Sequence, residues 1–293
     1  MHYKSSFSRK VFVVFNTCFI TITCCLCLLP VLHTFALSLS SAAATSGGRV
    51  GIWPVEFELG AYKMVIEDHR FLGAFLTSVK RVALGLVVDM AMTILAAYPL
   101  SKTKAQFPYR NLYMVFFIIP MYFGGGLIPT FLIVNKTGLL DSLWALVLPG
   151  AVATSYIILL LNYFRSLPDE IYESARVDGA GEWRILAQII LPLAKPILAV
   201  LVVYIVVRHW NSWFDGMLYI NSVDKYPLQS YLQTLIVELN PMQLVNIEAV
   251  KKNFTTKNVS SARMFVAMVP VLCVYPFAQK YFIKGIVLGS VKG

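Results

Sequence analysis

Residues 166–196 read SLPDEIYESARVDGAGEWRILAQIILPLAKP and separate two long apolar runs of the chain. The order of capping and turn residues in this segment predicts two short helices. Ser166 is expected to cap the first helix, with Pro168 and two acidic residues in its first turn. Gly179 and Gly181 allow the positive φ that ends such a helix and turns the chain sharply.

The second helix is expected to open at Glu182 and to close at Pro192 and Pro196, before the next apolar run begins. Four residues give the helix pair one apolar side: Ile171, Ala175, Ile185 and Ile189. An apolar side flanked by charges predicts that the loop over residues 164–196 docks in the groove of a partner protein.

The rest of the chain has the composition of a membrane protein. Of its 293 residues, 58% are hydrophobic and only 14% are charged, and the mean hydropathy is +0.69. A hydrocarbon core about 30 Å thick needs about 20 apolar residues per helix. Six runs come close to or exceed that length: 11–37, 71–100, 111–134, 143–163, 197–214 and 264–283.

These runs lack the period-two alternation of a membrane barrel, so they are interpreted as helices. We therefore expect an all-α polytopic membrane protein with six spans in one transmembrane domain, residues 1–293. Its two long connections are the 164–196 loop and an outer loop over residues 215–263. In the outer loop, apolar residues from Leu228 to Ile236 recur at helical spacing and predict an amphipathic helix.

Lys and Arg are distributed unequally between the two sides of the predicted spans. The side that carries the termini and the 164–196 loop has 13 of them in short segments, and the other side has 9 in longer ones. This bias predicts a multi-pass protein with both termini in the cytoplasm. A cleaved secretory signal is the alternative for the first run, but 11–37 is longer than a signal's apolar region of about 7–15 residues.

Net charge, composition and cysteine usage argue against two further classes of ligand, nucleic acid and metal ions. The formal net charge is +10, but the apolar composition favours a membrane surface over nucleic acid as the reason. The five cysteines lie in the first and last apolar runs without ligand spacing, so no metal site is expected.

At the 164–196 loop the sequence resembles a known family. Glu173-Ser174-Ala175, Gly179 and Leu191-Pro192 match the EAA loop of the membrane subunits of bacterial ABC importers, the binding-protein-dependent permeases, although Ser174 replaces the usual Ala. The resemblance implies the type I permease fold and a loop that couples to ATPase subunits. It assigns this coupling role to eight residues: Glu173, Ser174, Ala175, Asp178, Gly179, Ala180, Leu191 and Pro192.

Other segments are similar to the carbohydrate permeases of this family that handle complex or acidic, alginate-like saccharides. They are residues 123–129, 139–144, 209–214 and 284–293. The resemblance implies a non-catalytic channel-forming subunit in the bacterial inner membrane. Its implied partners are a second permease, two ABC ATPase subunits and an extracytoplasmic solute-binding protein. The chain lacks the P-loop pattern, so ATP and Mg²⁺ would be bound by the ATPase subunits.

A second set of candidate residues lies inside the predicted spans, where charged and broken segments default to a substrate pathway or a pair. The set is Lys80, Arg81, Arg208, Trp210, Asn211 and Gly125. Alternatives remain for several members. Lys80 and Arg81 would snorkel if the second span began near Val82, and Trp210 could belong to an interfacial aromatic belt.

The glycine triplet that contains Gly125 also has two interpretations. It either unwinds the third span at membrane depth or marks a helix end with re-entry at the outer interface. Two other function classes stay open at this point, a polytopic membrane enzyme and a stand-alone secondary transporter. The enzyme would need clustered carboxylates near an interface, and the secondary transporter would not need the 164–196 loop.

Overall fold

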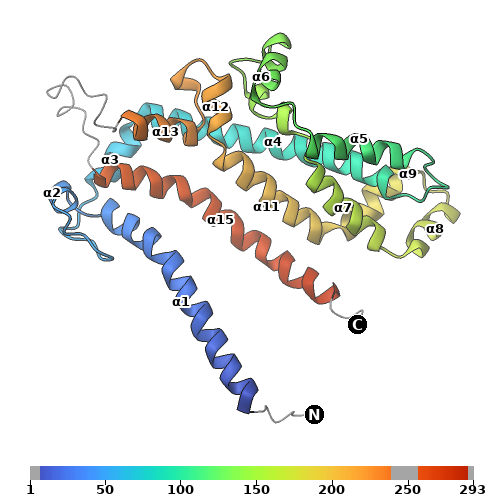
Figure 1. Cartoon of the computed structure of the whole chain (residues 1–293), viewed down its shortest axis with the longest axis horizontal. Helices are drawn as coiled ribbons and strands as arrows, with labels where there is room; N and C mark the ends of the chain where they lie inside the picture. The colour runs from blue at the N-terminus through green and yellow to red at the C-terminus, as the bar shows by residue number, and fades with distance from the viewer. Residues whose placement is uncertain (1–6, 239–256, 290–293) are drawn as a thin grey trace. The chain divides into compact units, whose positions relative to one another are not determined.

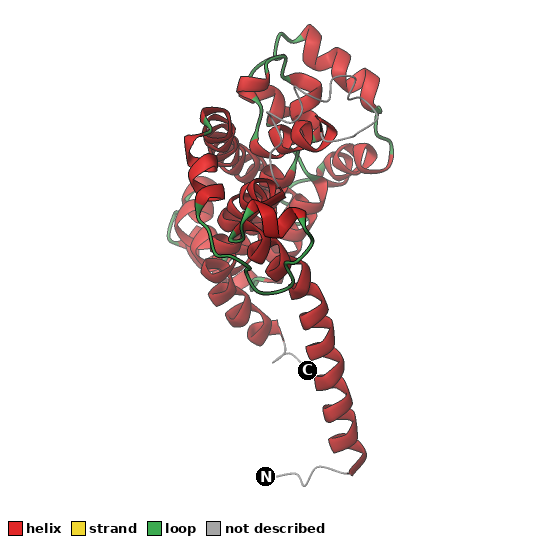
Figure 2. Ribbon diagram, turned by 90° about the vertical axis from the view of Figure 1, so that its left-hand side faces the viewer, coloured by secondary structure: helices red, strands yellow, loops and turns green. Residues whose placement is uncertain are grey.

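The computed structural model describes residues 7–238 and 257–289, and this part of the chain consists of helices joined by loops, without a strand (Figures 1 and 2). In chain order the elements are α1 (Phe7–Ser38), α2 (Ala42–Ser46), α3 (Gly60–Glu67), α4 (His69–Ser101), α5 (Arg110–Tyr122), α6 (Leu127–Lys136), η1 (Leu143–Leu146), η2 (Leu148–Gly150), α7 (Thr154–Ser166), α8 (Asp169–Val177), α9 (Glu182–Arg184), η3 (Ile185–Ile190), α10 (Leu191–Leu193), α11 (Lys195–Asn211), α12 (Phe214–Tyr219), η4 (Val223–Lys225), α13 (Leu228–Glu238) and α15 (Lys257–Gly289). The prediction of an all-helical polytopic protein is confirmed.

Each of the six predicted runs overlaps a helix, or a bent pair of helices, that is long and apolar enough to cross a membrane; in the pair at the fifth run only α11 lies in the predicted run, because α9–α10 belong to the 164–196 loop. The continuous ones are α1, α4 and residues 257–274 of α15. The bent pairs are α5 with α6 at 115°, η1–η2 with α7 at 54°, and α9–α10 with α11 at 81°. The amphipathic helix predicted in the outer loop is α13; residues 239–256 of that loop lie outside the described residues.

The third run is not the single helix expected over 111–134. α5 has 13 residues, which span about 20 Å and fall short of a bilayer core of about 30 Å. The chain leaves helical geometry at the glycine triplet, where Gly126 has a φ of +83° and precedes α6. The positive φ that glycine permits is therefore the physical reason for the break.

Three other predicted bounds need correction. The helix expected over 143–163 begins only at Thr154, since Pro149 has no N–H to donate and residues 143–150 form two 3₁₀ turns instead. The fifth run starts at Lys195 and ends at Asn211, before the expected 214. The last helix starts at Lys257, so the outer connection is shorter than predicted.

The chain divides into two compact units, each described by itself. The first comprises residues 1–69 and 239–268. In it, α1 ends on a small cluster of Ala36, Ala44 and Val50. The start of α15 joins this unit through Phe265, whose ring lies 4.6 Å from that of Phe35, and through the 2.8 Å ion pair of Arg263 with Asp68.

The second unit comprises residues 70–238 and 269–293. Its main core joins the last turns of α4 to α7, α8, η3 and α11, and the fully buried members include Leu100, Leu160, Phe164 and Ile185. A separate small cluster packs Val134 of α6 against Leu146 and Tyr219. The main core thus holds the 164–196 loop against the end of α4.

Candidate functional site

The first helix of the 164–196 loop is α8, and it ends as the glycine pattern predicted. Gly179 has a φ of +75°, and the next amide, of Ala180, donates to the Ala175 carbonyl at 2.9 Å. The expectation for Gly181 is wrong, because its φ is −71°. Ser166 is no cap either: it is the last residue of α7, and its hydroxyl donates to the Tyr163 carbonyl.

The second helix opens at Glu182 as predicted, but the prolines do not close it. After α9 the backbone widens into the π-helical turn η3 and continues through α10, with Pro192 inside it. Only at Ala194 does the chain bend, and Pro196 then occupies the first turn of α11. A proline in a first turn costs no hydrogen bond, so Pro196 starts a helix here.

Glu182 ties the loop to the end of α4. Its Oε2 accepts a hydrogen bond from the Tyr98 hydroxyl at 2.6 Å and one from Lys102 Nζ at 2.8 Å. Its Oε1 accepts from Arg176 of α8 at 2.9 Å. Lys102 Nζ also lies 4.6 Å from the centre of the Tyr172 ring. One carboxylate therefore joins α4, α8 and α9.

The surroundings of this contact shift the pKa values of its two charged partners, Glu182 and Lys102. Burial by itself would raise the pKa of Glu182, but hydrogen bonds from Lys102, Tyr98 and Arg176 outweigh it and lower the pKa to about 2. Burial lowers the pKa of Lys102, and the Glu182 carboxylate opposes that shift. Above the ordinary pKa of a glutamate the contact is therefore an ion pair.

The eight predicted coupling residues divide between the surface and the core of the loop. Ala175 is buried within its own chain, while Ala180 and Leu191 are half-buried. The other five lie on the surface: Glu173, Ser174, Asp178, Gly179 and Pro192. The apolar side expected to meet a partner is directed inward instead, with Ala175 and Ile185 in the main core.

Two large apolar residues of α8 and α9 are exposed and were not singled out by the sequence. Val177 is 88% exposed and Trp183 is 73% exposed. Together with Glu173, Ser174 and Asp178 they make the loop's outward surface. No spacing rule predicts their exposure. A tryptophan soon after the turn at Gly179 is the one sequence feature that could have indicated this surface.

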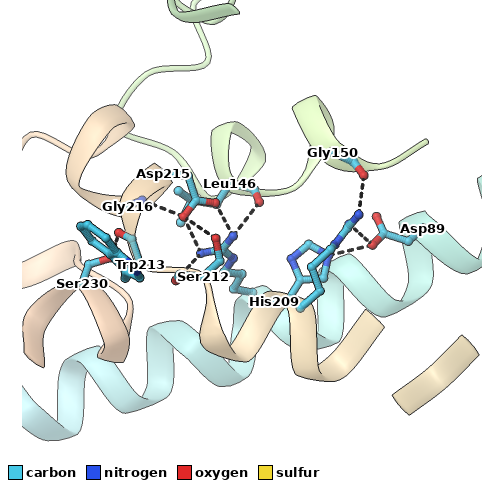
Figure 3. A network of polar contacts seen from close by, with 11 residues as sticks. Asp89, Leu146, Gly150, His209, Ser212, Trp213, Asp215, Gly216 and Ser230 are labelled. Carbon is cyan, nitrogen blue, oxygen red and sulfur yellow. Dashed lines mark hydrogen bonds and ion pairs between the residues drawn. The ribbon is translucent and has the colours of Figure 1, made fainter. Parts of the chain in front are cut away.

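A second candidate site is the network of charges between α4, the η1–η2 segment and the end of α11, drawn in Figure 3. The Arg81 side chain is 3% exposed. Its guanidinium donates to both oxygens of Asp215 and to the carbonyls of Leu146 and Ser212. The snorkelling alternative for Arg81 is therefore wrong, because α4 begins at His69 and Arg81 is paired inside the protein.

Arg208 forms the other half of this network. Its guanidinium donates to Asp89, which is fully buried, and to the Gly150 carbonyl at 2.8 Å. His209 Nε2 contacts the same Asp89 oxygen at 2.8 Å. A 270 Å³ cavity lies beside these groups, lined among others by Arg81, Arg208 and Gly150. Both arginines thus bind carbonyls of the 3₁₀ segment over 143–150.

The remaining residues predicted for a substrate pathway are not brought together. Trp210 is 3% exposed and packs edge-on against Phe75, 5.5 Å between ring centres, so its indole is closed to a sugar ring in this conformation. Lys80, Asn211 and Gly125 are exposed on α4, at the end of α11 and between α5 and α6.

The comparisons with known proteins identify this helical chain as a membrane component of a transport system. Residues 89–287 match the family of binding-protein-dependent transport system inner membrane components. The chain belongs to this family of integral membrane proteins.

Two relatives and one solved structure match over nearly their whole lengths. Protein LplC of Bacillus subtilis is 37% identical to this chain, over 97% of this chain and 96% of the LplC chain. The polygalacturonan/rhamnogalacturonan transport system permease YtcP of the same organism is 36% identical over 92% and 93%. A crystal structure of a bacterial ABC transporter involved in the import of the acidic polysaccharide alginate matches with a TM-score of 0.86 and 33% identity, over 96% of this chain and 99% of that one.

Replacing Glu182 by Gln should loosen the 164–196 loop, because Lys102 would lose its carboxylate while its side chain stays only 10% exposed. We expect faster amide hydrogen exchange over α8 and α9. The pKa of Glu182 is lowered in the folded protein to about 2, so wild-type protection should persist above about pH 4.5 and be lost as the pH falls through about 2. The control is Glu170→Gln, an exposed residue of α8; equal exchange in the two variants would contradict the anchoring role.

Replacing Gly85 by Ala should disrupt the charge network. A Cβ at Gly85 would lie 2.3 Å from His209 Nε2, so the imidazole would have to leave Asp89, at a cost of about 1–3 kcal/mol. Gly73→Ala on the same helix is the control, since nothing lies within 4 Å of its Cβ position and alanine should stabilise the helix by about 0.5–1 kcal/mol. Thermal unfolding in detergent measures both; a Gly85 variant as stable as the Gly73 variant would show that His209 moves freely.

Proposed function

We propose that this chain is the channel-forming permease subunit of an ATP-driven importer for an acidic oligo- or polysaccharide. The family assignment carries the transport role. The saccharide is supported by two similar proteins, the polygalacturonan/rhamnogalacturonan permease and the transporter involved in import of the acidic polysaccharide alginate. We propose the inner membrane of a bacterium as its location, with both termini in the cytoplasm.

Four kinds of partner complete the proposed importer. They are a second permease subunit, two ABC ATPase subunits, an extracytoplasmic solute-binding protein and the lipid of the membrane. The ATPase subunits bind ATP and Mg²⁺ and carry out hydrolysis, while this chain catalyses no reaction. The family's description as binding-protein-dependent transport systems supports the solute-binding protein.

The 164–196 loop is the proposed site of ATPase contact. Its exposed surface presents Glu173, Ser174 and Asp178 beside Val177 and Trp183. Its inward side is fixed by the main core and by Glu182, so a force applied to α8 is carried to the end of α4. The buried Ala175 and the half-buried Ala180 and Leu191 position this surface, and Gly179 and Pro192 shape it.

Gly179→Val tests the coupling role. At a φ of +75° a β-branched residue is strained by about 1–3 kcal/mol and should displace α8. The matched control is Gly181→Val, since Gly181 has a φ of −71° that valine tolerates. We expect Gly179→Val to lose saccharide uptake and substrate-stimulated ATPase activity in reconstituted vesicles, and Gly181→Val to keep both. Normal coupled uptake by the Gly179 variant would contradict the proposal.

Arg208 is the proposed contact for an acidic sugar. Its side chain is 32% exposed, whereas that of Arg81 is 3% exposed, so of the two arginines that bind backbone carbonyls Arg208 is the one that can reach a ligand. Asp89 already neutralises part of its charge, and a uronate would take the place of the Gly150 carbonyl. Lys80, Asn211 and Gly125 complete the proposed pathway as exposed residues, with Trp210 supporting α11 from within.

Arg208→Gln should therefore reduce uptake of a uronate oligomer by about tenfold or more, the value of one charged hydrogen bond of about 1.5–3 kcal/mol. Uptake of a neutral oligomer of equal length should be spared. Lys136→Gln, an exposed cation in the last turn of α6, is the control at matched expression. Equal losses for both sugars would assign Arg208 to structure alone, and no loss for either would remove it from the pathway.

A further inference from the structure

The loop between α2 and α3, residues 47–59, has a fixed conformation within the first unit. Val50 is buried, and Val55 packs beside it on Ala36 and Ala44. Glu56 is held at a φ of +53°, and its carboxylate accepts hydrogen bonds from the Ser41 hydroxyl and from Arg49 at 2.9 Å. The loop therefore presents a constant set of side chains outward.

The outward set contains large apolar residues. Trp53 is 81% exposed, and its neighbour Ile52 is 48% exposed. Further along, Phe57 is 68% exposed. A loop that buries Val50 and half-buries Val55 but leaves its tryptophan exposed is suited to a surface that is itself apolar on one side and polar on the other.

The height of this loop along α1 identifies that surface. His33 Nδ1 lies 2.7 Å from the Gly51 carbonyl oxygen, so Gly51 is level with His33. The loop turns back beside the end of α1 (Figure 1). From Val11, the first apolar residue after Arg9 and Lys10, α1 rises about 33 Å to His33 at 1.5 Å per residue. A helix tilt of about 20° reduces this to about 31 Å.

A hydrocarbon core about 30 Å thick that begins at Val11 ends just before His33. Gly51 and the two residues after it consequently lie at the boundary between acyl chains and headgroups, the depth at which tryptophan is enriched in membrane proteins. Phe57 lies farther from the core, because it pairs with Ser40, beyond the end of α1. The five residues from His33 to the end of α1 at Ser38 alone separate the two levels by about 7.5 Å at 1.5 Å per residue.

We propose that the 47–59 loop is a membrane anchor that inserts Ile52 and Trp53 into the interfacial region of the leaflet at the end of α1 opposite the N-terminus. The partner is the lipid bilayer itself. This contact fixes the depth and orientation of the end of α1, through the His33–Gly51 hydrogen bond and the cluster of Ala36, Ala44 and Val50.

Tryptophan fluorescence tests the proposal on the full chain, assembled with its transporter partners in vesicles of phosphatidylcholine and phosphatidylglycerol. The emission of Trp53 is the difference between wild type and Trp53→Phe. We expect it to be blue-shifted relative to tryptophan in water. Lipid brominated near the headgroup end of its acyl chains should reduce it strongly, and aqueous iodide should reduce it weakly.

The chain offers a matched control with unchanged composition, the double variant Trp53→Phe/Phe57→Trp. The indole at position 57 is expected to respond more to iodide and less to brominated lipid than the indole at position 53. Equal or reversed responses would overturn the proposal. So would a Trp53 emission that iodide alone quenches, which means open water, or that neither agent quenches, which means a protein surface.

Discussion

Glu182 bonds to three groups from separate parts of the chain, and the position of the 164–196 loop depends on that one carboxylate. Tyr98 and Lys102 reach it from the end of α4, and Arg176 reaches it from α8. Since the lysine is nearly buried, it needs a counter-charge where it stands. The loop is consequently attached to a long membrane helix by both apolar packing and charge, and its outward surface is left free for a partner.

A related constraint shapes the middle of α4. Inside a bilayer, charges and irregular backbone must be satisfied by the protein itself. Arg81 with Asp215 and Arg208 with Asp89 meet both needs together, because each arginine neutralises a carboxylate and also binds a carbonyl of the 143–150 segment. Helix α4 therefore connects the loop at its C-terminal end to the 3₁₀ segment over 143–150 near its middle, and α11 shares both contacts. A displacement of the loop has a physical route to the broken spans.

The sequence predicted the features that depend on local chemistry. The apolar runs predicted six regions that form helices or bent helix pairs able to cross a membrane, the glycine triplet predicted the break between α5 and α6, and Gly179 predicted the positive φ that ends α8. Pro149 and Gly150 indicate the late start of α7. The apolar run around them is unbroken, however, and hydropathy alone predicts one continuous helix there. These features follow from one residue's backbone preference or from length and hydropathy.

Long-range pairs were beyond the reach of such rules. A charge in a span is expected to find a partner, but nothing near Arg81 points to Asp215, and nothing near Tyr98 points to Glu182. The apolar side of the loop was assigned to a partner protein for the same reason. An apolar stripe indicates that some surface covers it but not which one, and here α4 and α7 of the same chain cover it. Trp210 was likewise expected at a sugar-binding or membrane surface, but its ring packs against Phe75 and is buried.

The central claim is that the outward surface of the 164–196 loop meets the ATPase subunit. Its most direct test is thiol crosslinking from Val177→Cys, whose side chain is 88% exposed, in the complex purified with its partners. The account predicts a crosslink to the ATPase subunit whose yield changes between the ATP-bound and nucleotide-free states, with none from Ala43→Cys on α2. A Val177→Cys variant that imports saccharide normally yet gives no ATPase crosslink in either state would contradict it.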